Sequence, residues 1–194
     1  MASPLIADVI RPANTKTAWI YDVALVAGFS LVIALGAQVA IPLPFTPVPV
    51  TLQTLAVLVT GCLLGSGRGA LAVICYLCEG FAGLPVFSGG TAGISHLVGP
   101  TGGYLLGFVA AAFIVGVLAE RGALRSRLGT LAALVAGNLV LYVPGVVWLG
   151  AYTGMSRAVS LGFVPFVVGD LLKTAAGWGL LSGAALVTGT TRRT

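Results

Sequence analysis

The sequence predicts an all-α integral membrane protein with six transmembrane helices, on three observations. Charged side chains are scarce: the 194 residues include ten Lys and Arg and five Asp and Glu, or 8%, whereas 58% are apolar. A soluble domain carries about 25% charged residues. Four long runs contain no charged residue, namely 23–67, 80–119, 128–156 and 174–191. Because a membrane helix needs about 20 predominantly apolar residues, the first two runs suffice for two crossings each, and clusters of Pro and Gly divide them.

The six helices are expected at about residues 19–40, 51–65, 68–84, 102–120, 130–149 and 163–187. A proline-rich run ends the first helix, glycines around Arg68 separate the second from the third, and a glycine-rich stretch precedes the fourth. Loops rich in Gly and aromatic residues separate the last two. The second helix is short, so tilting or neighbouring non-helical chain would complete its crossing.

One membrane domain is expected, at residues 19–188, between two short tails. Residues 1–18 contain Asp8, Arg11 and Lys16 and lack an apolar segment with a small-residue cleavage site, so they are interpreted as a cytoplasmic tail rather than a signal peptide. Residues 189–194 form a basic cytoplasmic tail. The composition excludes disordered, collagen-like and disulfide-stapled chains.

The basic residues predict the orientation. With six helices, the side that carries both termini holds eight of the ten Lys and Arg, whereas the other side holds Arg157 and helix six contains Lys173. Cytoplasmic loops are enriched in Lys and Arg, so both termini are expected in the cytoplasm. This topology explains the net charge of +5 without nucleic acid as a partner. The eight are Arg11, Lys16, Arg68, Arg121, Arg125, Arg127, Arg192 and Arg193.

Three predicted outer segments are rich in Pro, Gly and aromatic residues. The first outer segment, residues 41–50, has four prolines in eight residues, which impose an extended path and predict a loop folded over the bundle. The third outer segment, residues 150–157, follows Trp148 and contains Tyr152. Such aromatics are either interfacial anchors or a stacking surface for a ring-shaped ligand.

The second outer segment, residues 83–103, holds seven glycines and two prolines. Glycine allows close approach of the backbone to a ligand, and tight turns are the alternative interpretation. Thr101 is expected to cap the following helix, whose N-terminus would suit a carboxylate. The segment contains neither a dinucleotide-binding nor a P-loop motif.

Asp170 and Lys173 are charged residues inside the last helix. Their i, i+3 spacing puts both on one helix face, and Asp170 is expected about 10 Å below the outer end at 1.5 Å per residue. A charge within a bilayer costs about 2.5–3.5 kcal/mol or more. The pair therefore predicts a dry pocket for a small ligand with N–H donors and a carbonyl or carboxylate. A self-neutralising pair that only fixes helix packing is the alternative.

Other polar residues give weaker signals. Glu79 either joins this site or faces water, and the amides of Gln38, Gln53 and Asn138 are expected to form interhelical hydrogen bonds. The pair Cys75 and Cys78 lies within an apolar helix without a second Cys pair, and His96 is the sole histidine. Neither pattern predicts a metal site.

Several of these stretches resemble the BioY family, the biotin-specific S components of energy-coupling factor transporters. The similarity lies in the run from Pro42 to Val57, in Gly83–Phe87 followed by Gly89 and Gly90, in Gly99–Phe108, and in Gly169–Lys173. It covers about residues 20–187. The resemblance implies a high-affinity biotin-binding membrane subunit without cofactor or enzymatic activity, in the plasma (inner) membrane of a bacterium or archaeon.

The resemblance also implies partners and site residues. A transmembrane coupling subunit and two cytoplasmic ATPases, which use the ATP, would join this chain, and the family's docking face in the first helix corresponds loosely to Ala24, Gly28 and Ala34. Asp170 would accept the ureido N–H groups of biotin, and Lys173 would donate to its carbonyl or carboxylate. The implied substrate-binding residues are Gly89, Gly90, Thr101, Gly102, Tyr104, Asp170 and Lys173.

Two other functions remain open from the residues. A self-sufficient, ion-coupled or facilitative carrier for biotin or another vitamin-like molecule would use Asp170 or Glu79 as proton carrier if proton-driven. An intramembrane aspartyl enzyme would need Asp22 and Asp170 to meet, yet the two are expected at opposite ends of their helices. Motifs for a serine-hydrolase elbow or a zinc protease are also missing from the sequence.

Overall fold

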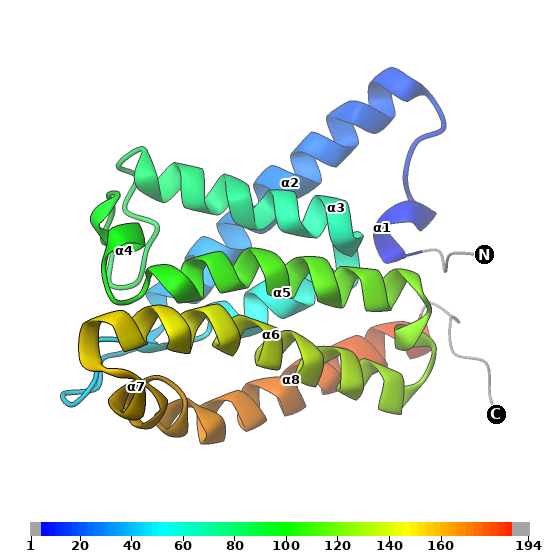
Figure 1. Cartoon of the computed structure of the whole chain (residues 1–194). Helices are drawn as coiled ribbons and strands as arrows, with labels where there is room; N and C mark the ends of the chain where they lie inside the picture. The colour runs from blue at the N-terminus through cyan, green and yellow to red at the C-terminus, as the bar shows by residue number, and fades with distance from the viewer. Residues whose placement is uncertain (1–4, 188–194) are drawn as a thin grey trace.

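The computed structural model describes residues 5–187, and most of them are helical (Figure 1). Five stretches of this described part are long and apolar enough to cross a membrane. They are α2 (Thr15–Gln38), α3 (Gln53–Phe81), α5 (Gly102–Glu120), α6 (Arg127–Thr153), and the run Met155–Gly183, which spans α7 (Met155–Gly162), the 3₁₀ turn η2 (Val164–Phe166) and most of α8 (Val167–Val187). The expected α-helical membrane fold is therefore confirmed at this level.

Short elements connect these helices. They are α1 (Ile6–Val9), the two-residue strands β1 (Ala40–Ile41) and β2 (Val50–Thr51), α4 (Ser95–Val98) and η1 (Ala123–Arg125). The antiparallel strands pair Ala40 with Thr51 and Ile41 with Val50, and so close the base of the first outer segment. Arg192 and Arg193 were expected on the cytoplasmic side. They belong to the tail at residues 189–194, which lies outside the described residues.

Two helices begin earlier than their hydropathy predicts because a polar side chain caps each one. Asn14 accepts a hydrogen bond from the Lys16 N–H (3.0 Å), and Ser126 accepts one from the Gly129 N–H (3.0 Å). Such caps satisfy amide groups that lack an intrahelical partner. The helices therefore begin at residues 15 and 127 instead of 19 and 130.

The α3 helix is broken at Gly65, whose φ of +84° and ψ of −177° are not helical. A Cβ added to Gly69 would lie 3.0 Å from the Gly61 Cα, although residues eight apart in a straight helix are separated by about 12 Å at 1.5 Å per residue. The chain therefore turns back at Gly65, near α1 (Figure 1). The break divides α3 into arms at 53–64 and 66–81, close to the boundary predicted from the sequence.

Glu120, the last residue of α5, stabilises the turn. Its carboxylate accepts hydrogen bonds from the Ser66 N–H (2.7 Å) and hydroxyl (2.9 Å), and a negative charge at a helix N-terminus is favourable. A Cβ on Gly65 would lie 2.5 Å from the Glu120 Oε1 and 2.7 Å from the Leu5 Cδ1. Only glycine fits this position at low cost, because both its φ and its surroundings exclude a side chain.

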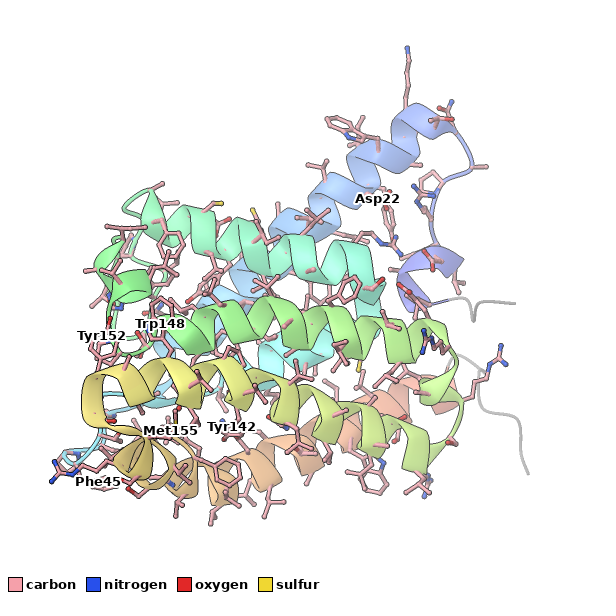
Figure 2. All side chains as sticks on the ribbon, in the orientation of Figure 1. Asp22, Phe45, Tyr142, Trp148, Tyr152 and Met155 are labelled. Atoms are coloured by element: carbon pink, nitrogen blue, oxygen red, sulfur yellow. The ribbon has the colours of Figure 1, made fainter. Side chains whose placement is uncertain are left out.

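The two ends of the molecule differ in charge. Asp22 pairs with Arg11 (2.6 Å) and Arg68 (3.1 Å), and Arg68 also pairs with Asp8 (2.5 Å). Figure 2 shows Asp22 at the end of the molecule opposite Phe45 and Trp148. The α1 helix and the C-terminal part of α8 lie at the same end as Asp22 (Figure 1). The prediction that Asp22 and Asp170 do not meet is confirmed, since each has its own cationic partner.

Replacing Gly65 with Ala tests the turn. The substitution is expected to cost about 1–3 kcal/mol of folding free energy, because it combines a left-handed backbone with contacts to Leu5 and Glu120. Thermal unfolding in detergent measures this cost. Gly67→Ala is the matched control, since a Cβ there meets nothing within 4 Å. Equal melting temperatures for the two variants would contradict the role of Gly65.

Candidate ligand-binding site

A cavity of about 330 Å³ lies between the outer segments and the ends of the helices. Its wall combines the first outer segment, both arms of α3, the second outer segment, α5, α6, η2 and α8. Small-molecule pockets in proteins occupy about 300–1,000 Å³ and are mostly apolar with a few polar groups. The lining includes Pro47, Val48, Pro49, Phe87, Tyr104, Leu105, Phe108, Leu141 and Phe166. The cavity therefore suits one small, partly apolar molecule.

Asp170 and Lys173 lie together in the wall of this cavity. Their charged groups are 2.5 Å apart, and each residue is 8% exposed. The Lys173 ammonium also donates to the Thr51 carbonyl (3.0 Å) and, at 3.5 Å, to the Thr54 hydroxyl. The second Asp170 oxygen accepts a hydrogen bond from the Tyr142 hydroxyl on α6. Four segments thus meet at one ion pair.

The pair retains hydrogen-bonding capacity for a ligand. A carboxylate offers about four lone-pair positions. The Asp170 Oδ2 accepts one hydrogen bond, from Tyr142, whereas the Oδ1, which forms the ion pair with Lys173, accepts none from the described residues. Removing two charges from water costs several kcal/mol per ion, and their mutual attraction does not always repay this cost. A ligand that supplies further N–H donors to Asp170 would therefore be recognised strongly.

Aromatic rings flank the polar groups. The Tyr142 ring packs edge-on against Phe163 (centroids 4.8 Å apart) and Tyr104 (6.5 Å). The Phe87 ring, 2% exposed, contacts Tyr76 (5.5 Å) and the His96 ring (5.1 Å). These contacts fix the side chains that bound the cavity, so its shape is largely formed without a ligand.

The predicted glycines of the second outer segment support the cavity rather than line it. Gly89 and Gly90 have φ values of +74° and +70° and form the tight turn that pairs the Phe87 N–H with the Thr91 carbonyl (3.0 Å). Gly102 lies against the Leu97 carbonyl and Trp148. Within the described chain, these three glycines are not part of the lining, whereas the side chains around them are.

Thr101 and Tyr104 do line the cavity, but each hydroxyl also donates a hydrogen bond to a backbone carbonyl of the protein. Thr101 occupies the position before α5, yet its side chain does not cap the helix, because its backbone is already helical (φ −88°, ψ −10°). Its hydroxyl instead donates to the His96 carbonyl (3.2 Å). The Tyr104 hydroxyl donates to the Gly162 carbonyl (2.7 Å). The predicted cap interaction is therefore wrong, whereas both side chains lie in the wall of the cavity.

The third outer segment differs from its prediction, because α6 continues to Thr153 and α7 begins at Met155. Trp148 donates to the Gly99 carbonyl (2.9 Å), and the Tyr152 hydroxyl donates to the Val98 carbonyl. Figure 2 shows both aromatic side chains beside α4. They hold the second outer segment in place and, within residues 5–187, do not line the cavity.

Several functional neighbours were not predicted from the sequence. Tyr142 and Thr54 contact the ion pair. Tyr76 in the cavity wall accepts a hydrogen bond (2.9 Å) from the Gln53 amide, which was expected to bond between helices. The position of Tyr142, four residues after Asn138 on the same helix face, was the available signal. Asn138 itself donates to Thr174 on α8 (2.9 Å), as an interhelical amide was expected to do.

Glu79 neither joins the cavity nor simply faces water. Its carboxylate accepts hydrogen bonds from the Ser30 hydroxyl on α2 (2.8 Å) and the Cys75 thiol (3.4 Å). It therefore links α2 to the second arm of α3. Among the described residues, no three metal-binding side chains form a cluster.

Comparisons with known proteins give the same family over most of the chain. A family model described as "BioY family" matches residues 11–188. A Thermotoga maritima protein named "Biotin transporter BioY" is 46% identical over 146 residues, which cover 75% of this chain and 84% of that protein. A "Probable biotin transporter BioY" from Pyrococcus horikoshii is 41% identical over 154 residues, covering 79% and 90%.

A solved structure has the same fold. It is described as the crystal structure of "the S-component for biotin from an ECF-type ABC transporter". The TM-score is 0.76 and the identity is 26%, with 89% of this chain and 94% of that chain covered. The likeness therefore extends over nearly the whole length of both chains.

A double-mutant cycle tests whether Asp170 and Lys173 act as one unit. Asp170→Asn or Lys173→Met alone leaves a buried charge without its partner and is expected to cost about 3–5 kcal/mol of stability. Combining the two is expected to cost less than either alone. Thermal unfolding without ligand measures the cycle, with Lys16→Met at an exposed position as control. Strictly additive losses would contradict the coupling.

Proposed function

The chain belongs to the BioY family, and from this premise we propose that it is the biotin-binding membrane subunit, the S component, of an energy-coupling factor transporter. The observation that carries the proposal is the buried Asp170–Lys173 pair in the wall of a 330 Å³ cavity. It follows that the chain is a transport protein and not an enzyme.

The chemistry of biotin matches the polar groups of the cavity. Its ureido ring has two N–H donors and one carbonyl acceptor. The Asp170 carboxylate would accept the N–H groups, and the Lys173 ammonium would donate to the ureido carbonyl or to the carboxylate of the acyl chain. A buried polar site discriminates strongly against ligands that leave its groups unpaired. The apolar side chains between the two outer segments would contact the sulfur-containing ring and the acyl chain.

The outer segments would exclude water from the bound ligand. Pro47, Val48 and Pro49 line the cavity on one side, and Phe87 lines it on another. The conformation of the first outer segment is restricted by its prolines, whose φ is fixed. Of the predicted glycines, Gly89, Gly90 and Gly102 would act indirectly by shaping the backbone, while Thr101 and Tyr104 would contact the ligand.

Six crossings with both termini in the cytoplasm are the topology we propose. The two arms of α3 would cross separately, because they lie on opposite sides of the break at Gly65. The positions of Arg68 and the basic residues around η1 support a cytoplasmic location for the end that carries α1. The membrane would be the plasma membrane of a bacterium or archaeon.

Energy coupling would come from other subunits. The sequence contains no ATP-binding motif, so a transmembrane coupling subunit and two cytoplasmic ATPases would complete the transporter. The α2 helix is the least buried of the five candidate spans, which supports it as the docking helix. A Cβ on Gly28 would meet nothing within 4 Å, whereas Ala34 is buried. The docking face would therefore include Gly28 and exclude Ala34.

Calorimetry with biotin in detergent tests the site. Asp170→Asn and Lys173→Met are each expected to weaken binding by about 1–3 kcal/mol or more, because each leaves a buried polar partner of the ligand unpaired. Lys16→Met should bind as the parent does. Thiamine and riboflavin are expected not to bind. Parental affinity for biotin in both site variants would show that the site lies elsewhere.

Reconstitution separates this function from a self-sufficient carrier. Liposomes that contain only this chain are expected to bind biotin without concentrating it. Uptake by the chain alone that a protonophore abolishes would identify an ion-coupled carrier instead.

Cysteine labelling tests the topology in a variant that lacks the native cysteines. Cysteines that replace the exposed residues Phe45 and Ala82 are expected to react with an impermeant maleimide on intact cells, and a cysteine at Lys16 only after permeabilisation. Phe45 and Ala82 flank the two arms of α3, so both lie outside if each arm crosses. Labelling of these two positions from opposite sides would contradict six crossings.

A further inference from the structure

Gln38, the last residue of α2, contacts the second outer segment with its side chain. The amide nitrogen lies 3.2 Å from the carbonyl oxygens of Val86 and Phe87, and 3.2 Å from the Ala34 carbonyl one turn earlier. The NH₂ group therefore donates toward two consecutive carbonyls of another segment. Gln38 is not among the lining residues of the cavity, so the mechanism of ligand recognition does not use it directly.

The backbone that Gln38 contacts carries a principal wall residue of the cavity. Phe87 is 2% exposed, and its ring packs between Tyr76, Phe81 and His96. The ring also occupies the space beside Gly80 where a Cβ would otherwise lie. A shift of the backbone at Val86–Phe87 would therefore withdraw the ring and open the cavity.

Other bonds hold the second outer segment at different points. The Gly93 N–H donates to the Gly80 carbonyl (2.8 Å), and Trp148 and Tyr152 donate to the carbonyls of Gly99 and Val98. Within residues 5–187, the side-chain hydrogen bonds that reach Val86 and Phe87 come from Gln38. The side-chain hydrogen bonds to the backbone at Val86 and Phe87 thus come from α2, whereas the Phe87 ring packs on α3.

The α2 helix is well placed to supply this attachment. Its buried residues near the outer end, Ile33, Ala34 and Ala37, pack into the bundle, and Ser30 donates to Glu79 on α3 (2.8 Å). Its N-terminal part extends away from the other helices (Figure 1). Gln38 therefore lies at the fixed end of the helix, next to the loop that it holds.

We propose that Gln38 is a positioning residue that holds the second outer segment closed over the ligand and thereby sets the rate at which the ligand leaves. The identity of the ligand rests on the proposed function, whereas the attachment of the loop does not. Loss of the attachment raises the population of the open segment. An open segment speeds ligand escape and does not hinder ligand entry, so dissociation changes more than association.

Substitutions that differ in donor capacity test the role of Gln38. Gln38→Glu, of nearly the same shape, replaces the donor by an acceptor that faces two carbonyls, and Gln38→Leu removes the donor. Both are expected to raise the biotin dissociation rate about tenfold, on the usual strength of one or two hydrogen bonds, with association within about twofold of the parent. Gln38→Lys keeps a donor and should dissociate within about threefold of the parent. Leu35→Ala, exposed on the same helix, is the control.

Hydrogen exchange followed by mass spectrometry supplies a readout without ligand. In Gln38→Glu and Gln38→Leu, amides of residues 84–94 are expected to exchange faster, while α6 keeps the parental rate. Unchanged dissociation and unchanged exchange in both variants would overturn the proposal, as would faster exchange throughout the protein. If the parent itself does not bind biotin, the proposed function fails, and exchange at residues 84–94 still decides the role of Gln38.

Discussion

An ion pair in an apolar interior requires polar partners on every side, and the outer half of this protein is organised around that requirement. Lys173 reaches the Thr51 carbonyl at the base of the first outer segment and the Thr54 hydroxyl of α3, while Asp170 is held by Tyr142 of α6. The segments that contribute these groups are also the walls of the cavity. The hydrogen bonds that stabilise the buried ion pair therefore also shape the cavity.

The opposite end of the molecule uses charge for a different purpose. There, Arg11, Asp22, Arg68 and Asp8 form a chain of ion pairs between the N-terminal segment, α2 and α3, and Glu120 caps the second arm of α3. These groups are more exposed than Asp170 and Lys173, so each exposed pair contributes little stability by itself. Their main effect is to fix the turn at Gly65 and the start of α2. Charge thus organises the chain at one end and lines the cavity at the other.

The sequence predicted the features that are costly in a membrane. Long charge-free runs indicate the helices, and Asp170 and Lys173 stand out because a charge in the bilayer is expensive. Tyr142 could not be predicted in the same way, because a tyrosine in an apolar helix is also typical of simple packing. An amide near the end of a membrane helix predicts an interhelical hydrogen bond, whereas Gln38 bonds to a loop whose path depends on Gly89 and Gly90. The roles of Trp148 and Tyr152 likewise depend on where the second outer segment folds. Residue chemistry thus singled out the ion pair that lies in the cavity wall, whereas tertiary contacts determine which residues surround it.

A structure of the protein with bound biotin tests the central claim most directly. The ureido ring is expected within hydrogen-bonding distance of both the Asp170 carboxylate and the Lys173 ammonium, beneath the Phe87 ring. Biotin bound outside this cavity, or inside it with the Asp170–Lys173 pair making no contact to the ligand, would contradict the account.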